Sequence, residues 1–242
     1  MESVAITDIG SRRKVNQDFV YNNDNAVGLL PNLYIVADGM GGHKAGDFAS
    51  KFSVSEFEKE LKEQKARTII GSMEGAIRQV NEKLLKEATA EPEYEGMGTT
   101  FVAACISDGN LFVLNIGDSR LYMLSEAGTI KQITQDHSLV EEKILRGELE
   151  RKEAKNHPEK NVITRALGAT EQVLPDFFEV EITTGDYILL CSDVLTNMVE
   201  DVIIKDIVLN QEYELKEKAE RLIALANENG GRDNISLVLV HI

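Results

Sequence analysis

The 242-residue sequence lacks any long hydrophobic run. No segment approaches the ~18 consecutive apolar residues that a transmembrane helix needs, and residues 1–13 contain no apolar stretch after a basic start. Neither membrane insertion nor a signal peptide is therefore expected. Cysteine is also scarce: Cys105 and Cys191 both lie in apolar, strand-like segments, which favours buried reduced thiols over a disulfide. Together these features predict a protein of the cytoplasm.

Positive charge is in short supply as well. Lys and Arg number 26 against 41 Asp and Glu, which gives a formal net charge of −15. Nucleic acids and anionic membranes are bound through a positive field, so a nucleic-acid partner is not expected and a two-metal nuclease is disfavoured. The charge balance fits a protein that binds cations, or a basic or neutral partner.

Proline is rare, and its four occurrences form no linker-like cluster. The chain also has no internal repeat and no low-complexity tract. Its 43% hydrophobic and 28% charged residues are the mixture of a folded globular protein. Residues 1–242 are therefore predicted to form a single domain.

The hydrophobic pattern groups strands with strands and helices with helices. Helical spacing occurs over about 45–61 and in two further stretches, with apolar faces made by Ile70, Met73, Ile77, Val80 and Leu84, and by Leu215, Ala219, Leu222 and Ala226. The strand-like segments are 3–7, 19–21, 33–37, 100–107, 111–115, 120–124, 130–133, 178–182, 187–191 and 235–242. Asp108-Gly109 between two of them is a two-residue hairpin signal. Because strands and helices do not alternate regularly, the pattern predicts a layered α+β sandwich.

Residues 138–167 differ from the rest of the chain. They are polar and charged, with little apolar surface for packing. This composition predicts short helices that form a flap appended to the core.

Five aspartates follow or precede apolar strand-like segments: Asp18, Asp38, Asp118, Asp193 and Asp233. One carboxylate at the end of a buried strand is usually a turn former or a helix cap. Five in one domain favour a bound cation, because burying a carboxylate is costly unless a positive charge pairs with it. Oxygen donors with few imidazoles favour Mg²⁺ or Mn²⁺ over zinc.

Other phosphate chemistries do not match the spacing. No arginine stands six residues after either cysteine, as the loop of a cysteine-based phosphatase requires. The glycine-rich segment 39–44 lacks the four-residue spacer of a Walker loop, and no serine lies in a Gly-x-Ser-x-Gly turn.

Seven short motifs run in order across nearly the whole chain. They are Thr7-Asp8-Ile9-Gly10 with Arg13-x-x-Asn16-Gln17-Asp18; Ala37-Asp38-Gly39-Met40-Gly41-Gly42-His43; Gly96-Met97-Gly98-Thr99-Thr100; Gly117-Asp118-Ser119-Arg120; Thr134-x-Asp136-His137-Ser138; Cys191-Ser192-Asp193; and Gly231-Arg232-Asp233-Asn234. Each is weak alone, but the ordered set resembles the bacterial branch of the metal-dependent type 2C (PPM) Ser/Thr protein phosphatases. The chain looks closest to the single-domain Gram-positive enzymes that oppose a membrane-bound Ser/Thr kinase.

The resemblance implies a four-layer α-β-β-α sandwich, with two antiparallel sheets between helix pairs and a metal centre at one end. Asp38 would bridge two Mn²⁺ or Mg²⁺ ions. The Gly39 carbonyl and Asp18, through water, would complete one ion, and Asp193 and Asp233 would hold the other. A water activated between the ions would then hydrolyse phosphoserine or phosphothreonine in proteins.

Further roles follow from the same resemblance. Asp118 would help to bind a third, weaker ion, and Arg13 would hold the substrate phosphate, although Arg13 could instead pair with an acidic neighbour. His43 or a metal-activated water would protonate the leaving group. His137 is expected to fix a loop, and residues 138–167 would be the family's flap.

The expected partners are phosphorylated proteins, including a Ser/Thr kinase and its substrates, and the expected state is a monomer. One position departs from the family pattern: Val194 follows Asp193 where the family has glycine. If that glycine has positive φ, valine would be strained by about 1–3 kcal/mol. This motivates an alternative hypothesis, a binding module that keeps the fold but has impaired catalysis.

Overall fold

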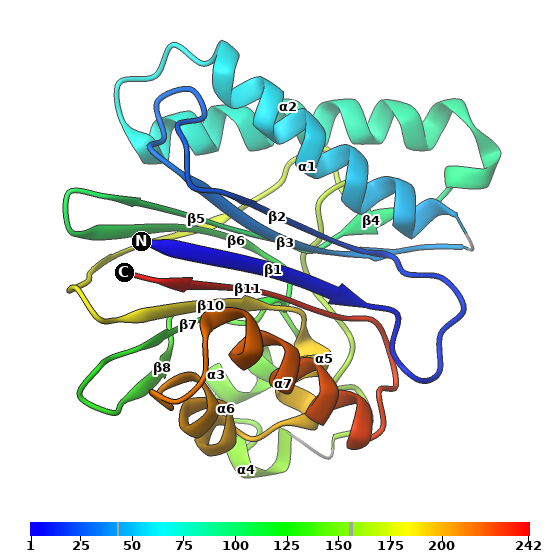
Figure 1. The fold of residues 1–242 in the computed structure, drawn as a ribbon. Coiled ribbons are helices and arrows are strands. Elements are labelled where there is room, and N and C mark those ends of the chain that lie inside the picture. Colours follow the sequence, from blue (N-terminus) through cyan, green and yellow to red (C-terminus); the bar gives the residue numbers. More distant parts are fainter. Residues whose placement is uncertain (43, 155–156) are drawn as a thin grey trace.

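The computed structural model describes residues 1–42, 44–154 and 157–242, and its two antiparallel sheets lie face to face between layers of helices (Figure 1). One sheet has the order β1(Glu2–Asp8), β11(Ile235–His241), β10(Tyr187–Cys191), β7(Arg120–Leu124) and β8(Ile130–Gln132). The other has the order β2(Asp18–Asn23), β3(Leu33–Met40), β5(Phe101–Ser107), β6(Asn110–Ile116) and β9(Asp176–Glu181), with the short β4(Gly98–Thr99) beside β3. The predicted α+β sandwich is confirmed.

Local sequence signals explain the tightest connection in the second sheet. Asp108 and Gly109 join β5 to β6, and both have positive φ, +51° and +76°. Two consecutive positive φ values match the right-handed twist of a hairpin, which is why Asp-Gly is favoured there. The hairpin predicted from this dipeptide is therefore confirmed.

Two long helices cover the outer face of the second sheet, α1(Ala45–Glu63) and α2(Ile69–Ala90). The outer face of the first sheet is covered by α5(Asp193–Met198), α6(Asp201–Val208) and α7(Leu215–Glu228). The sequence predicted α1, α2 and α7 but not α5 and α6, because six and eight residues are too few for helical periodicity to stand out.

Three apolar layers hold the sandwich together. The first lies between α1, α2 and the second sheet, and contains the predicted stripe of α2 from Met73 to Leu84. The second lies between the two sheets, and the third lies between the first sheet and α5, α6 and α7. The predicted stripes of α2 and α7 lie in these cores, except for Ile70 of α2, which is only partly buried and does not belong to them.

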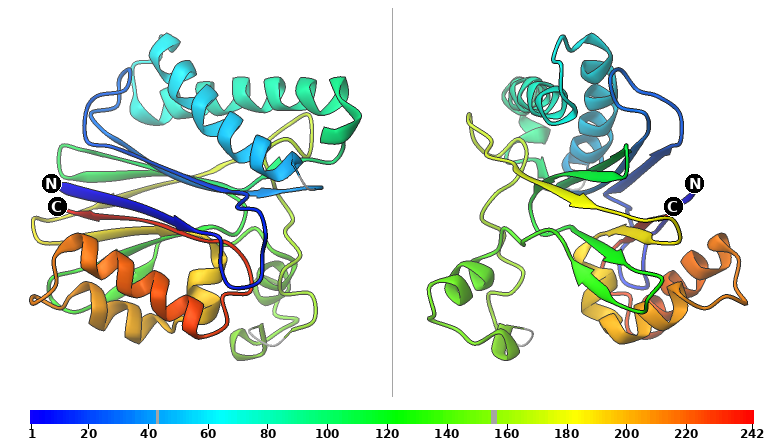
Figure 2. Two further views of the ribbon diagram at one scale, coloured as in Figure 1. Left: turned by 45° about the vertical axis from the view of Figure 1, so that its right-hand side comes forward. Right: turned by 90° about the vertical axis from the view of Figure 1, so that its left-hand side faces the viewer.

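Residues 138–167 stand out from the sandwich, as the second view of Figure 2 shows. They contain α3(Leu139–Leu145) and α4(Arg151–Ala154), the short helices expected from the polar composition. A backbone bridge between Ser138 and Ile163 joins the two ends of this segment. A second bridge, between Leu167 and Thr99, connects the segment to the sandwich. Outside this segment, a 3-10 turn spans Pro92–Tyr94.

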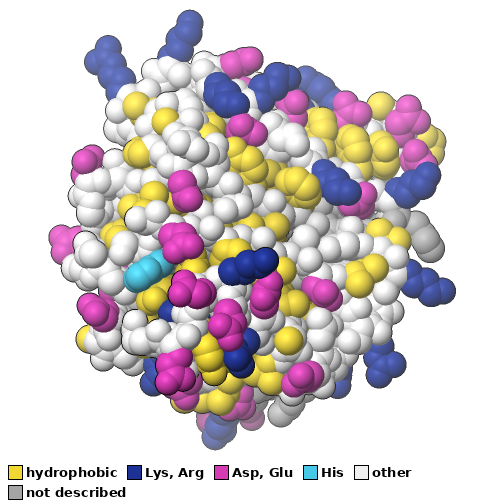
Figure 3. Space-filling view, viewed as in Figure 1, with side chains coloured by type: hydrophobic (Ala, Val, Ile, Leu, Met, Phe, Trp, Pro, Cys, Tyr) yellow, Lys and Arg dark blue, Asp and Glu magenta, His cyan; other side chains and the backbone are white. Residues whose placement is uncertain are grey.

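Charged side chains of both signs are interspersed over the face drawn in Figure 3. Among the residues that the structure describes, no helix combines the length and the apolar character needed to cross a bilayer.

Candidate functional site

Five aspartates meet where strand ends of both sheets come together. Asp18 begins β2 and lies directly opposite Asp38 of β3 in the antiparallel register. Asp118 follows β6, Asp193 is the first residue of α5 after β10, and Asp233 precedes β11. The antiparallel order brings these positions close enough for the charges of Asp18, Asp118, Asp193 and Asp233 to act on Asp38.

Hydrogen bonds hold the Asp38 backbone in place. Its N–H donates to Thr100 Oγ1 (2.9 Å), and its carbonyl accepts from the Thr100 N–H (2.9 Å) and from Thr99 Oγ1 (3.0 Å). Thr100 Oγ1 also shares a hydrogen bond of 2.7 Å with Ser119 Oγ. The paired threonines were recognised in the sequence as a motif without a role, and the structure shows that they position Asp38.

Gly39 lies where two backbone segments pass very close to each other. A Cβ atom on Gly39 would lie 2.0 Å from the Gly46 carbonyl oxygen and 2.6 Å from the Gln17 carbonyl oxygen. Any side chain would push β3 away from the start of α1. The glycine is thus required for close packing beside Asp38.

The carboxylates destabilise one another's charge. Burial raises the pKa of Asp18 to about 6. Burial, followed by the charges of Asp18, Asp193, Asp118 and Asp233, raises the pKa of Asp38 well above its ordinary value. The pKa values of Asp118 and Asp193 are also raised, first by burial and then by neighbouring carboxylates. Such mutual repulsion is compensated when a cation binds among the groups.

Asp18 is the clearest sign that a cation belongs here. Its side chain is 3% exposed, and within the described part of the chain neither of its carboxylate oxygens has a partner at hydrogen-bonding distance, although Ser236, Asp38 and Ser192 are near enough to lower its pKa. In residues 1–42, 44–154 and 157–242, no three acidic, His or Cys side chains already form a metal cage. Asp193 and Asp233 instead bond to neighbouring side chains. Oxygen donors with uncompensated negative charge suit hard divalent ions, so the residues present fit Mg²⁺ or Mn²⁺.

Arg13 lies against Asp233. Its Nη2 is 2.5 Å from Asp233 Oδ2, so the alternative of an acidic partner for Arg13 is confirmed. The turn at Gly10 allows this contact: Gly10 has φ +78°, and a Cβ there would lie 2.1 Å from the Asp233 carbonyl oxygen. Both side chains of the pair are partly exposed, which leaves the Arg13 guanidinium accessible from solvent.

Asn234 joins the Arg13 loop to β11. Its Nδ2 donates to the carbonyls of Ile9 (2.9 Å) and Val15 (3.0 Å), and its Oδ1 accepts from the Gln17 N–H (2.9 Å). Sequence reasoning gave Asn234 no role. Its partners are more than 200 residues away, so only its place beside Asp233 could have drawn attention to it.

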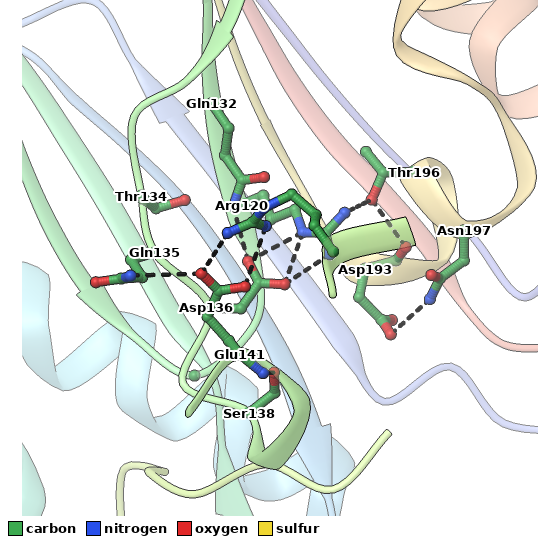
Figure 4. Close-up of polar contacts among 12 residues, drawn as sticks. Arg120, Gln132, Thr134, Gln135, Asp136, Ser138, Glu141, Asp193, Thr196 and Asn197 are labelled. Carbon is green, nitrogen blue, oxygen red and sulfur yellow. Dashed lines mark hydrogen bonds and ion pairs between the residues drawn. The ribbon is translucent and has the colours of Figure 1, made fainter. Parts of the chain in front are cut away.

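A second network positions Asp193 (Figure 4). Arg120 binds both carboxylate oxygens of Asp136 at 2.6–3.0 Å and donates from Nη1 to Thr196 Oγ1 (2.7 Å). Thr196 donates to the Asp193 carbonyl (3.1 Å), and Asn197 Nδ2 donates to Asp193 Oδ2 (2.8 Å). This network ties α5, which carries Asp193, to β7.

His137 fixes the loop before Asp118, as expected. The Gly117 backbone N–H donates to His137 Nδ1 (3.0 Å), and the backbone N–H of His137 donates to the Gly117 carbonyl (2.9 Å). Burial lowers the pKa of His137, which keeps Nδ1 free to accept. The other candidate histidine, His43, lies outside the described residues.

The prediction that Val194 is strained was wrong. Val194 lies in the first turn of α5, and Asp108 is the only non-glycine residue with positive φ in the described part of the chain. Helical φ is open to valine, so no conformational strain arises there. The side chain is 7% exposed and packs into the third apolar layer. The alternative of a catalytically impaired binding module therefore loses the strain that motivated it.

The raised pKa values predict an unusual pH response of the metal-free protein. Folded Asp18 binds a proton at about pH 6, whereas its ordinary value is 3.8. Between these values the folded state holds more protons, so stability rises as the pH falls. From pH 7.5 to 5.5 we expect a gain of about 1 kcal/mol from Asp18 alone, or about 2–4 °C in Tm.

Thermal unfolding in EDTA across this pH range measures the effect. With Mn²⁺ present the trend should reverse, because the ion must displace protons from its ligands. Asp18→Asn should flatten the metal-free response. A Tm in EDTA that falls steadily from pH 7.5 to 5.5 would contradict the interpretation.

Comparisons with known proteins agree with this site. The family model "Protein phosphatase 2C" matches residues 10–235. The Serine/threonine phosphatase stp of Listeria welshimeri is 42% identical, over 97% of this chain and 93% of its own length.

Solved structures show the same fold. The serine/threonine phosphatase of S. agalactiae superposes with a TM-score of 0.92 at 38% identity, covering 100% of this chain and 99% of that one. The catalytic domain of the serine threonine protein phosphatase PstP, in complex with two manganese ions, superposes with a TM-score of 0.85 at 34% identity, covering 98% of this chain and 96% of that one. The chain therefore belongs to the protein phosphatase 2C family of metal-dependent Ser/Thr protein phosphatases.

Proposed function

We propose that this phosphatase hydrolyses phosphoserine and phosphothreonine in proteins at a centre of two Mn²⁺ or Mg²⁺ ions, with a weaker third ion. The observation that carries the proposal is the group of five aspartates in which burial and the charges of the other four raise the pKa of Asp38 well above its ordinary value. The manganese in the PstP structure supports the same ion type.

The proposed ligand set follows the positions of the aspartates. Asp38 would lie between two ions. Asp18 and the Gly39 carbonyl would serve one, and Asp193 and Asp233 the other. When bound, the ions supply an activated water for attack on phosphorus and neutralise charge on the phosphate oxygens.

The chain's own groups complete the reaction. Asp118, fixed by the loop that His137 holds, is the proposed ligand of the third ion. Arg13 is the proposed phosphate clamp, because its guanidinium can exchange Asp233 for a phosphate and bind it through two N–H groups. His43 is the proposed proton donor to the leaving alkoxide.

Release of inorganic phosphate from phosphopeptides tests the function. We expect phosphoserine and phosphothreonine peptides to be hydrolysed with Mn²⁺. The same sequences carrying phosphotyrosine serve as the comparison and should react far more slowly. Failure to release phosphate from any phosphoserine or phosphothreonine peptide would overturn the proposal.

Arg13→Ala should mainly raise KM for a phosphopeptide. The clamp acts on the phosphate before and during reaction, and water partly replaces an exposed hydrogen bond, so we expect an increase of about tenfold, or ~1.4 kcal/mol, with a smaller fall in kcat. Steady-state kinetics at saturating Mn²⁺ measure both constants. Arg12→Ala removes the same charge from the adjacent exposed position and is the control. An unchanged KM for Arg13→Ala would refute the clamp.

The proposed context is a bacterial kinase pathway. Residues 1–242 would act as one catalytic domain and a monomer, with 138–167 as its flap. A phosphoprotein substrate requires a Ser/Thr kinase to produce it, so that kinase and its substrates are the proposed partners. Cys105 and Cys191 are buried and free, which suits the reducing cytoplasm.

A further inference from the structure

The carboxylate site opens into a cleft of about 340 Å³ whose walls are not all acidic. Asp38, Asp118, Asp193 and Asp233 line one part of it. Because these carboxylates line the cleft itself, a phosphorylated residue held at them must place its neighbours along the remaining walls. A cleft of this size has room for roughly one or two side chains beyond the phosphate.

Four apolar side chains form part of the remaining wall. They come from three separate segments: Met40 at the end of β3, Ile163 in the segment 138–167, and Val194 and Met198 on α5. Met40, Ile163 and Met198 are partly exposed, and Val194 lies deeper, at 7% exposure. Two of the four are methionines, whose flexible side chains adapt to different apolar partners.

Val194 and Met198 share α5 with the proposed ligand Asp193. Asp193 begins the helix, and Asn197 anchors its carboxylate one turn later (Figure 4). The apolar wall is therefore held on the same rigid element as the phosphate site. A side chain next to the phosphorylated residue would reach it without any movement of α5.

Two cations also line the cleft, Lys160 and Arg232. Neither forms an ion pair with another side chain in residues 1–42, 44–154 and 157–242. The chain carries a net charge of −15, which repels acidic peptides in general. Two unpaired cations beside the phosphate site provide a local exception, with charge complementary to an acidic residue.

We propose that this cleft is a substrate subsite that selects phosphopeptide segments with an apolar residue next to the phosphorylated residue and an acidic residue close by. Val194, Met198, Met40 and Ile163 would receive the apolar side chain. Lys160 and Arg232 would pair with the acidic one. The proposal deepens the proposed function and rests on it. Val194 supplies the deepest apolar side chain of this subsite.

The test compares four phosphothreonine peptides in Mn²⁺. The two residues that flank the phosphothreonine are either both leucine or both glycine. The residues at the next positions outward are either aspartate or serine, and the four peptides are the four combinations. For the wild type we expect kcat/KM to be about tenfold higher with leucine than with glycine. We expect about fivefold higher kcat/KM with aspartate than with serine, declining as salt screens the charges.

Variants separate the two parts of the subsite. Val194→Thr keeps the shape but adds a hydroxyl, and Met198→Gln keeps the length but adds an amide. Each should reduce the leucine-to-glycine ratio to about threefold or less. Lys160→Gln combined with Arg232→Gln should remove the aspartate preference and its salt dependence. The matched controls are Val202→Thr on the exposed face of α6 and Lys216→Gln on α7, both of which should keep the wild-type ratios.

A general loss of activity lowers kcat/KM for all four peptides by the same factor, so it leaves the leucine-to-glycine and aspartate-to-serine ratios unchanged. If all four peptides are hydrolysed equally well, or the variants keep the wild-type ratios, the subsite is overturned while the phosphatase function stands. If no peptide is hydrolysed, the proposed function fails and the subsite fails with it.

Discussion

Asp38→Asn is expected to lower kcat for phosphopeptides by more than about 10³-fold while raising the Tm of the metal-free protein. Asp38 is the carboxylate on which the charges of the other four act, and it is proposed to lie between two ions. The amide would not supply the negative charge that the proposed ions need at Asp38, so we expect turnover to be lost. Without metal, however, the same substitution removes a poorly solvated charge from a cluster of like charges.

The opposite directions of the two effects distinguish a ligand from a structural residue. Phosphate release gives kcat, and thermal unfolding in EDTA gives Tm. Asp108→Asn at the tip of the β5–β6 hairpin removes one negative charge from an exposed site and serves as the control for net charge. Activity within tenfold of wild type, or a large drop in Tm, would remove Asp38 from the proposed centre.

The β5–β6 hairpin shows what local sequence can predict. Asp108-Gly109 needs only its own backbone preferences to form the turn. The stripe of α2 likewise depends on spacing within one segment, and both predictions are confirmed. The pairing of β6 with β9, in contrast, joins residues that are between 61 positions (Asn115 and Asp176) and 71 positions (Asn110 and Glu181) apart, and no local pattern specifies such a partner.

Val194 shows where reasoning from a single position failed. The strain argument assumed that the residue after Asp193 has positive φ, but α5 begins at Asp193 and gives Val194 ordinary helical geometry. Six residues of helix are too short for periodicity to reveal. The helical backbone at position 194, rather than the β-branched side chain of valine, explains why no strain arises there.

The candidate site was predictable as a set of acidic residues, because each carboxylate stands beside an apolar segment. Its supporting contacts were not. Asn234 bonds to a loop near the N-terminus, and Arg120 bonds to Asp136 and Thr196, so these roles exist only after distant segments have packed together. Long-range contacts of this kind leave no periodic signal in the sequence.

Removal of divalent ions is expected to abolish phosphopeptide hydrolysis and to lower the Tm. The proposed centre has oxygen donors, and among the described residues the two carboxylate oxygens of Asp18 have no partner at hydrogen-bonding distance, so we expect the reaction to depend on an added cation. Mn²⁺ at about 100 times its Kd should stabilise the fold by about 2.7 kcal/mol per independent site, or at least about 5 °C in Tm. Titration of the chelated protein with Mn²⁺ or Mg²⁺ should restore activity.

If one metal centre supports both catalysis and stability, phosphopeptide hydrolysis and Tm should respond to the same ions. Asp18→Asn should weaken the stabilisation by Mn²⁺, because the ion no longer relieves the charge of a carboxylate that is 3% exposed. Asp108→Asn should leave the stabilisation at its wild-type size, since its charge is already solvated. Full activity after exhaustive chelation would exclude a metal-dependent reaction. A wild-type Tm that is insensitive to Mn²⁺ would mean that the repulsion among the five aspartates is relieved in some way other than by a bound cation.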